Sequence, residues 1–269
     1  MQALRAEPRA RGRVRVKTIA LPAEHGGWGL LFEPIALGLL LAPSIAGVYL
    51  ALSALGFFLA RHPLTLLVLN RRHKSPRTAL AKRFAGVYLI IGTSSFIAAL
   101  VFAEHLFFIP LLMATPLAIV QVGYDWTGRR RVLLAEIAGA ISISSIVAAI
   151  TLAGGWSSAG AMALWAIMIA RCVPAILYIR AWLERLHARR ASPFPMLAGH
   201  VLAIVGVAFL LNAQLANALT VGAMGMLLIR AVVGFASVEK LTPKRLGFVE
   251  IGFGAMAVSL VAIGFAVGG

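Results

Sequence analysis

Acidic residues are scarce in this sequence, where 9 Asp and Glu stand against 25 Lys and Arg in 269 residues. Charged residues of both signs make up 13% of the chain, well below the roughly 25% that soluble domains carry. Hydrophobic residues make up 61%, and the mean hydropathy is +0.92. Too few polar side chains remain to cover a water-soluble core. The composition therefore excludes a soluble globular protein and indicates a membrane protein.

Cysteine is almost absent as well. The single Cys172 excludes an internal disulfide, and it lacks the companions of a thiolate zinc site. His62 and His73 have no grouped carboxylate or cysteine partners, so we expect no metal site and no cofactor. No small-residue cleavage site follows a short apolar run near the N-terminus, and we expect no cleavable signal peptide.

Long apolar runs fill most of the remaining sequence. A membrane helix needs about 20 mostly apolar residues, and this length predicts an all-α, polytopic membrane helix bundle with nine spans. We divide the chain into a basic tail, residues 1–20, and a single transmembrane helical bundle, residues 21–269. The predicted spans cover residues 26–42, 46–69, 84–103, 106–123, 133–153, 160–183, 194–211, 215–235 and 247–267.

The basic residues lie in every second connection. The tail holds six Lys and Arg and the segment 61–83 holds seven, whereas the connections after the first, third, fifth and seventh spans hold none. Basic residues mark the cytoplasmic loops of membrane proteins, so this pattern predicts a bacterial inner-membrane protein with a cytoplasmic N-terminus. The tail is expected to contact anionic membrane lipids. A nucleic-acid partner is not expected, because no polar domain carries the charge.

The segment Leu21–Pro34, LPAEHGGWGLLFEP, joins the tail to the first span. It carries the ionisable residues Glu24, His25 and Glu33, and glycines surround its Trp28. Carboxylates are costly at membrane depth, and a purely structural apolar helix does not need this combination. We therefore expect these four side chains to line a functional site.

Charged residues inside the apolar spans should face the bundle interior or an interface. Glu136 and Glu250 lie near basic loops, and we expect them to pair with Arg129–Arg131 or Arg245. Glu33 and Arg171 lie deeper, where a functional role and a structural ion pair are both open. The charged residues within the spans are Glu33, Glu136, Arg171, Arg230 and Glu250.

The sixth span carries a polar stripe. At 100° per residue, Arg171, Tyr178, Trp182 and Arg185 fall on one helix face. Together with Arg180, this stripe suits an anionic headgroup with an apolar tail. The alternative is an aromatic belt with arginines that reach to the interface.

The segment after the second span has no acidic residue. Its Asn70 and Arg71 can bind phosphate or carboxylate through charge-assisted hydrogen bonds. The alternative is a role in membrane topology alone. At the end of the fourth span, we expect Asp125 to lie near Arg129.

Three stretches carry a resemblance to a known family: LPAEHGGWGLLFEPIALGLLLAPS, VQVGYDWTGRRRVLLAEIAGAISISSIVAAITLAGG and ARCVPAILYIRAWLERL. They resemble the YwiC-like family of bacterial membrane proteins, whose members start with a similar Pro-x-Glu-His-Gly-x-Trp segment. The resemblance implies a bacterial membrane protein and no particular reaction.

The chain is more distantly similar to the UbiA-type prenyltransferases, which are nine-helix bundles with a cytoplasm-facing lipid cavity. In that superfamily, Asp-rich motifs after spans two and six hold magnesium on a prenyl diphosphate. The corresponding positions here read LNRRHKSPR and LYIRAWLER, without clustered carboxylates. Arginines can still bind a diphosphate directly, so it stays open whether the chain is an enzyme.

The leading hypothesis is a membrane protein of YwiC-like type, with a UbiA-like bundle, that binds an anionic amphiphile in a cytoplasm-facing cavity. The amphiphile would carry a lipid phosphate or carboxylate. One alternative is a divergent UbiA-like prenyl or lipid transferase, and another is a proton-coupled small-molecule transporter that uses Glu33 and His25. A structural or assembly role is a further alternative. The predicted ligand-binding residues are Glu24, His25, Trp28, Glu33, Asn70, Arg71, Arg171, Tyr178 and Arg180.

Overall fold

A computed structural model describes residues 16–22, 25–71, 75–103, 106–187, 191–237 and 242–267, and within these ranges the chain is helical without any β-strand. The predicted all-α bundle is therefore confirmed. The helices are α1 (Lys17–Ala20), α2 (His25–Leu41), α3 (Ile45–Leu69), α4 (Pro76–Phe102), α5 (Ile109–Trp126), α6 (Leu133–Ser144), α7 (Ile146–Ala153), α8 (Ser158–Leu186), α9 (Phe194–Asn212), α10 (Ala218–Ala236) and α11 (Pro243–Val267).

Seven helices in the described part of the chain are long and apolar enough to cross a membrane, if α6 and α7 are counted as one span, Leu133–Ala153. Helix α2 is shorter but apolar over Gly27–Leu41, and α5 has 18 residues. Each of the nine predicted spans thus corresponds to one helix, or to the pair α6–α7. The chain is a multi-pass helical membrane protein.

Helix α4 begins well before residue 84, where the apolar run begins. The Ser75 side chain accepts a hydrogen bond from Thr78 N at 3.2 Å, and the Thr78 hydroxyl accepts one from Ser75 N at 2.9 Å. Pro76 follows in the first turn, where a missing backbone N–H costs nothing. This capping box starts the helix inside the basic segment, which a search for apolar runs does not detect.

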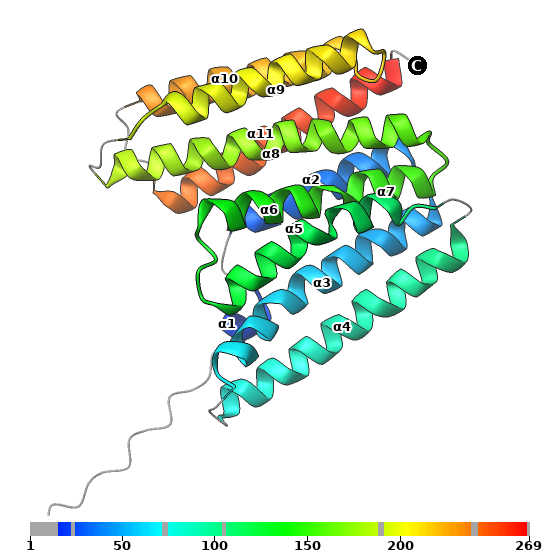
Figure 1. Ribbon diagram of the computed structural model, residues 1–269, viewed down its shortest axis with the longest axis vertical. Helices are drawn as coiled ribbons and strands as arrows, with labels where there is room; N and C mark the ends of the chain where they lie inside the picture. The colour runs from blue at the N-terminus through cyan, green and yellow to red at the C-terminus, as the bar shows by residue number, and fades with distance from the viewer. Residues whose placement is uncertain are drawn as a thin grey trace, which may run out of the picture.

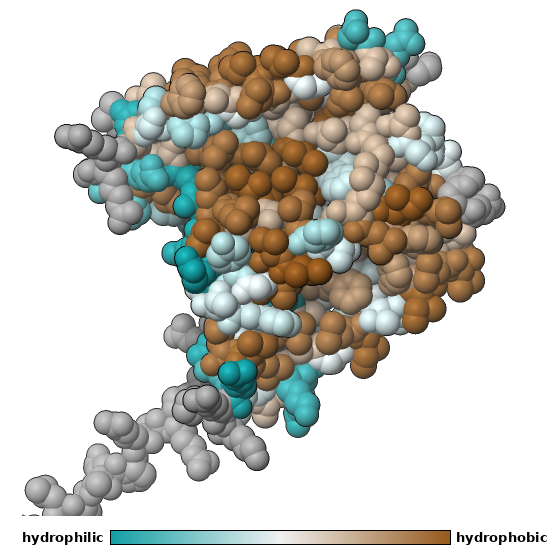
Figure 2. Space-filling model, in the orientation of Figure 1, coloured by the Kyte–Doolittle hydropathy of each residue, from teal (hydrophilic) through white to brown (hydrophobic). Residues whose placement is uncertain are grey.

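The helices run alternately in opposite directions, so that the connections gather at two ends of the bundle (Figure 1). The C-terminal ends of α3, α5, α8 and α10 lie at the left in Figure 1, and those of α2, α4, α7, α9 and α11 lie at the right. The face shown in Figure 2 is largely apolar, with hydrophilic residues gathered toward its edges. This arrangement agrees with the alternation of basic connections in the sequence.

The fifth predicted span is interrupted between α6 and α7, beside Ser145. The Ser145 hydroxyl donates to Ser142 O at 2.7 Å, and the Ser144 hydroxyl donates to Ile141 O at 2.9 Å. The Trp165 indole donates to the same Ile141 carbonyl from α8 at 3.0 Å. Side chains therefore satisfy carbonyls near the break, which is how an interrupted helix is tolerated at membrane depth.

Helices α3 and α4 pack most closely where two glycines meet. A Cβ atom placed on Gly56 would lie 2.6 Å from the backbone nitrogen of Gly92 and 2.9 Å from the carbonyl oxygen of Tyr88. No side chain can be accommodated there without a shift of the backbone. Close approach over small residues is a main source of helix association in lipid.

We expect Gly56→Ala to destabilise the bundle, because overpacking of a tight interface costs about 1–3 kcal/mol. Thermal unfolding in detergent micelles would measure the loss. Gly86→Ala on α4 is the matched control, since a Cβ atom there has nothing within 4 Å. Equal stability of the two variants would show that the α3–α4 contact adjusts without cost.

Candidate functional site

Four charged side chains from four different helices meet inside the bundle. We call Glu33 of α2, Arg171 of α8, Arg230 of α10 and Glu250 of α11 the buried quartet. Their exposed fractions are 7%, 4%, 7% and 5%. Two arginines and two glutamates give the quartet no net charge, which lowers the cost of its burial.

The quartet consists of two ion pairs joined by one further hydrogen bond. Arg171 Nη2 donates to Glu33 Oε1 at 2.8 Å and also to the backbone oxygen of Glu250 at 3.4 Å. Arg230 Nη2 donates to Glu250 Oε2. Glu33 and Arg171, which the sequence placed at membrane depth, are therefore partners. Glu250 pairs with Arg230 rather than with Arg245, because its side chain points into the bundle instead of toward the loop.

Tyr178 and Gly254 pack closely against the quartet. The Arg230 guanidinium lies over the ring of Tyr178, 4.3 Å from the ring centre, in cation–π geometry. A Cβ atom on Gly254 would lie only 1.9 Å from Glu33 Oε1 and 2.6 Å from Arg171 Nη2. Glycine at this position lets α11 approach the Glu33–Arg171 pair.

The sixth-span stripe faces the protein interior. Tyr178 and Trp182 are buried, in an apolar cluster that includes Met196 and Leu246. Arg185 lies at the exposed end of α8 and donates to the backbone oxygen of Phe235. The periodicity correctly identified one helix face, and this face packs against α9, α10 and α11 instead of forming an aromatic belt.

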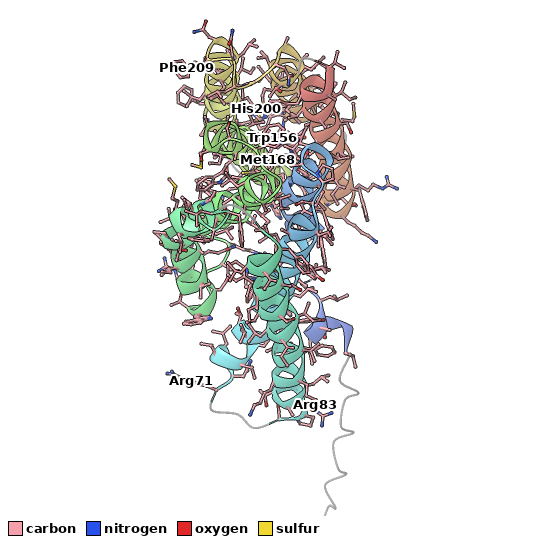
Figure 3. The ribbon with its side chains drawn as sticks, turned by 90° about the vertical axis from the view of Figure 1, so that its right-hand side faces the viewer. Arg71, Arg83, Trp156, Met168, His200 and Phe209 are labelled. Atoms are coloured by element: carbon pink, nitrogen blue, oxygen red, sulfur yellow. The ribbon has the colours of Figure 1, made fainter. Side chains whose placement is uncertain are left out.

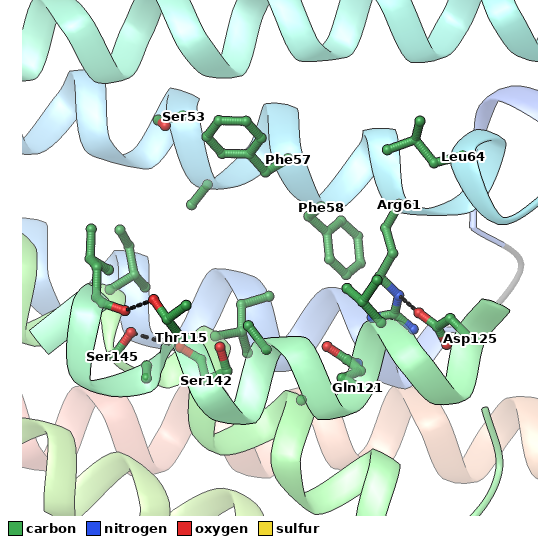
Figure 4. A pocket seen from close by; sticks show the side chains of 18 of the residues that line it. Ser53, Phe57, Phe58, Arg61, Leu64, Thr115, Gln121, Asp125, Ser142 and Ser145 are labelled. Carbon is green, nitrogen blue, oxygen red and sulfur yellow. Dashed lines mark hydrogen bonds and ion pairs between the residues drawn. The ribbon is translucent and has the colours of Figure 1, made fainter. Parts of the chain in front are cut away.

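A separate groove of about 400 Å³ lies between α3 on one wall and α5, α6 and α7 on the other (Figure 4). We call it the α3–α5 groove. Its lining is mostly apolar and includes Phe57, Phe58, Phe96 and Leu111. Polar side chains interrupt this lining along its length: Ser53, Thr115, Gln121, Ser142 and Ser145.

An ion pair closes the basic end of the α3–α5 groove. Arg61 Nε of α3 lies 2.7 Å from Asp125 Oδ2 of α5 (Figure 4). The Asp125 side chain is 3% exposed, whereas that of Arg61 is 32% exposed. Asp125 thus pairs with Arg61 of α3 across the groove, a partner that the sequence did not suggest. The pair joins two helices at the end where the basic connections gather.

A small second pocket of about 50 Å³ adjoins this ion pair, and we call it the head pocket. It shares Phe58, Arg61, Thr65 and Asp125 with the groove. Its remaining lining residues are Pro22, Gly27, His62 and Arg130. The segment Leu21–Pro34 thus contributes two residues to a pocket.

Trp28 and Phe58 connect the head pocket to the first span. Their rings meet edge to face, with centroids 5.3 Å apart, and Trp28 also stacks on Phe32 at 5.7 Å. His62 Nε2 donates to the Thr18 carbonyl at 3.1 Å, which holds α1 beside α3. Glu24 lies outside the described residues, as does the side chain of His25.

The remaining predicted ligand-binding residues lie apart from one another. The Asn70 side chain donates to Leu66 O at 2.9 Å at the end of α3, and the neighbouring Arg71 is exposed and projects outward (Figure 3). Arg180 donates to Glu136 at 2.8 Å and to the Arg131 carbonyl at 3.0 Å. Neither Arg71 nor Arg180 belongs to the buried quartet, and neither lines the groove.

Sequence reasoning did not single out Arg61, Ser53 or Gln121. Arg61 counted as one of seven basic residues, and Ser53 and Gln121 are isolated polar residues in apolar helices. One signal was available: Asp125 ends an apolar span, and a buried carboxylate needs a cation. Finding its partner required the three-dimensional proximity of α3 and α5.

The fold defines the class, a polytopic α-helical membrane protein with buried ion pairs and an apolar groove. Residues 21–151 match the family described as YwiC-like protein, which confirms the predicted resemblance over this range. The matched range includes every residue that lines the groove and the head pocket, and one member of the quartet, Glu33. No curated protein and no solved structure matches the chain.

We expect Arg230→Met to destabilise the protein by about 3–5 kcal/mol, because it leaves the Glu250 carboxylate buried without its cation. The double variant Arg230→Met with Glu250→Leu removes both charges and should recover most of this loss. Unfolding by heat or denaturant in detergent micelles would measure the stability of the unmodified protein, the single variant and the double variant.

The half-exposed pair Arg180–Glu136 provides the control for this comparison. Arg180→Met should cost less than about 1 kcal/mol, as exposed ion pairs do. A double variant at Arg230 and Glu250 that is as unstable as the single variant would contradict the pairwise coupling in the quartet.

Proposed function

We propose that this protein binds an anionic amphiphile in the α3–α5 groove, with the apolar chain along the groove and the charged head at the Arg61–Asp125 end. The observation that carries the proposal is the polarity of this groove. Apolar walls run between α3 and α5, and a charged pair closes one end only. An amphiphile has the same asymmetry.

The volume and the lining support a ligand rather than a packing defect. About 400 Å³ falls within the roughly 300–1,000 Å³ of small-molecule sites, which are mostly apolar with a few placed polar groups. The Arg61 guanidinium offers five N–H donors in a fixed fork, and its pairing with Asp125 engages Nε. Bidentate binding of a carboxylate or phosphate is the recognition mode that arginine favours.

We also propose that the basic end of the bundle faces the cytoplasm of a bacterial inner membrane, with the N-terminus on the same side. The described basic residues at this end include Arg71, Arg129 and Arg245. The opposite connections contain no Lys or Arg in the sequence. This orientation follows the distribution of basic residues in membrane proteins and places the charged end of the groove at the cytoplasmic interface.

The buried quartet has a different role in this proposal. Its charges are partnered by one another and lie away from the groove lining. We assign it to the orientation of α2 against α8, α10 and α11. The transferase and transporter alternatives stay predictions. The identity of a ligand that is retained on purification would indicate which activity to test next.

Native mass spectrometry of gently purified protein, combined with lipid extraction from the same sample, should reveal a retained anionic amphiphile. The test variant is Arg61→Gln with Asp125→Asn, which removes the charged end of the groove and avoids an unpaired buried carboxylate. We expect at least a tenfold loss of retained ligand, since a charge-assisted bidentate contact is lost.

The matched control is Arg180→Gln with Glu136→Gln, an ion pair of the same type and 2.8 Å length that lines neither pocket. It should retain the ligand at the level of the unmodified protein. Equal retention in both double variants, or no amphiphile in any preparation, would overturn the proposed site.

The orientation can be tested with single cysteines. Cys172 is 2% exposed, so Cys172→Ser gives a background without an accessible thiol. In the variant Arg71→Cys, the new thiol at this exposed position should be protected from a membrane-impermeant maleimide in intact cells with a permeable outer envelope. Cysteine at the exposed Gln214 position, in the turn between α9 and α10, should react. The reverse pattern would invert the topology.

A further inference from the structure

The head pocket sets a limit on the chemistry of the ligand. It is continuous with the α3–α5 groove through four shared residues, Phe58, Arg61, Thr65 and Asp125. Any chain that follows the groove to its charged end therefore reaches this pocket. The pocket and the groove form one elongated site with a wide apolar part and a narrow polar part.

The size of the head pocket favours a compact head. Its volume is about 50 Å³, and one water molecule needs roughly 10–15 Å³ on this measure. The pocket thus holds about three to five water-sized groups. This is room for the oxygens of one carboxylate or one phosphate monoester. A diphosphate with its counter-ion, or a glycerol-linked headgroup, needs more.

The charges around the head pocket favour an oxyanion. Among the described residues that line the pocket, Arg61 and Arg130 are positively charged and Asp125 is negatively charged, and His62 adds a ring nitrogen. The Asp125 carboxylate is already paired with Arg61 Nε at 2.7 Å. The described lining therefore carries more positive than negative charge, and Arg61 can bind a compact anion through charge-assisted hydrogen bonds.

The groove accommodates one chain. Its volume of about 400 Å³ lies at the lower end of the range for ligand sites, and phenylalanines line it at several levels. A diacyl lipid would have to place two chains side by side in this space. The apolar part and the polar part thus both point to a small, single-chain molecule.

We infer that the site selects a single-chain amphiphile whose head is one compact oxyanion, a carboxylate or a phosphate monoester, over diphosphates and diacyl phospholipids. This inference rests on the proposed function and adds the class of the ligand. Gly27 is a specificity-determining position in this assignment, because it lines the head pocket without a side chain. A Cβ atom there would meet the Phe58 ring at 3.4 Å, an ordinary contact, so that alanine fits but a larger side chain enters the pocket.

The test uses the purified full-length protein in detergent and measures the binding of five probes by calorimetry. The probes are oleate, oleyl phosphate, inorganic phosphate, farnesyl diphosphate with magnesium, and phosphatidylglycerol. We expect oleate and oleyl phosphate to bind at least tenfold more tightly than the other three. Gly27→Leu should weaken oleate binding at least tenfold, whereas Gly27→Ala should leave it within about threefold.

Gly86→Leu is the control for the bulk of the substitution, because position 86 has no neighbour within 4 Å and lies outside both pockets. It should bind oleate like the unmodified protein. If Gly27→Leu does not fold, competition between oleyl phosphate and farnesyl diphosphate for the unmodified protein tests the preference for a compact head by itself.

The possible failures are distinguishable. Tighter binding of farnesyl diphosphate or phosphatidylglycerol, still dependent on the Arg61–Asp125 pair, would overturn the compact head and leave the amphiphile site intact. Binding of inorganic phosphate as tight as that of oleyl phosphate would show a free-anion site and overturn the role of the chain. Absence of binding by every amphiphile would overturn both the inference and the proposed function.

Discussion

The Glu33–Arg171 ion pair is the constraint around which the bundle is arranged. It joins the first span to α8, and the bond from Arg171 to the Glu250 carbonyl extends this link to α11. An unpaired charge at this depth would be far more costly than the pair, so the two helices must meet in one register. Gly254 is part of the same constraint, because a Cβ atom there would collide with the Glu33 carboxylate.

The α3–α5 groove lies between two close helix contacts. Helix α3 is held closely against α4 by the Gly56–Gly92 contact, and α5 packs on α6 through Gly139, where a Cβ atom would lie 2.1 Å from Gln121 Nε2. These two tight contacts draw α3 and α5 toward opposite neighbours. The space between them is bridged at its basic end by Arg61 and Asp125. The groove is thus a consequence of where small residues lie.

Much of this architecture could be predicted from the sequence, because lipid imposes a simple rule on span length and loop charge. The nine spans and the burial of Glu33 and Arg171 followed from that rule. The partner of Glu250 did not, because proximity to Arg245 along the chain says nothing about which way a helical side chain faces. The groove could not be predicted from the sequence either. Its lining comes from five helices, and the isolated residues Ser53 and Gln121 are indistinguishable in sequence from polar residues of a packed interface.

The two polar systems of the protein differ in one property that assigns their roles. In the buried quartet each carboxylate has an arginine of its own, and all four residues are at most 7% exposed, so a ligand from outside the bundle has little access to them. At the groove, Arg61 is 32% exposed and lies beside Arg130, while Asp125 is buried beneath it. An incoming anion can add to Arg61 without displacing Asp125. This difference in exposure supports the proposal that an anion binds at the Arg61–Asp125 pair, and that the quartet fixes the orientation of the helices.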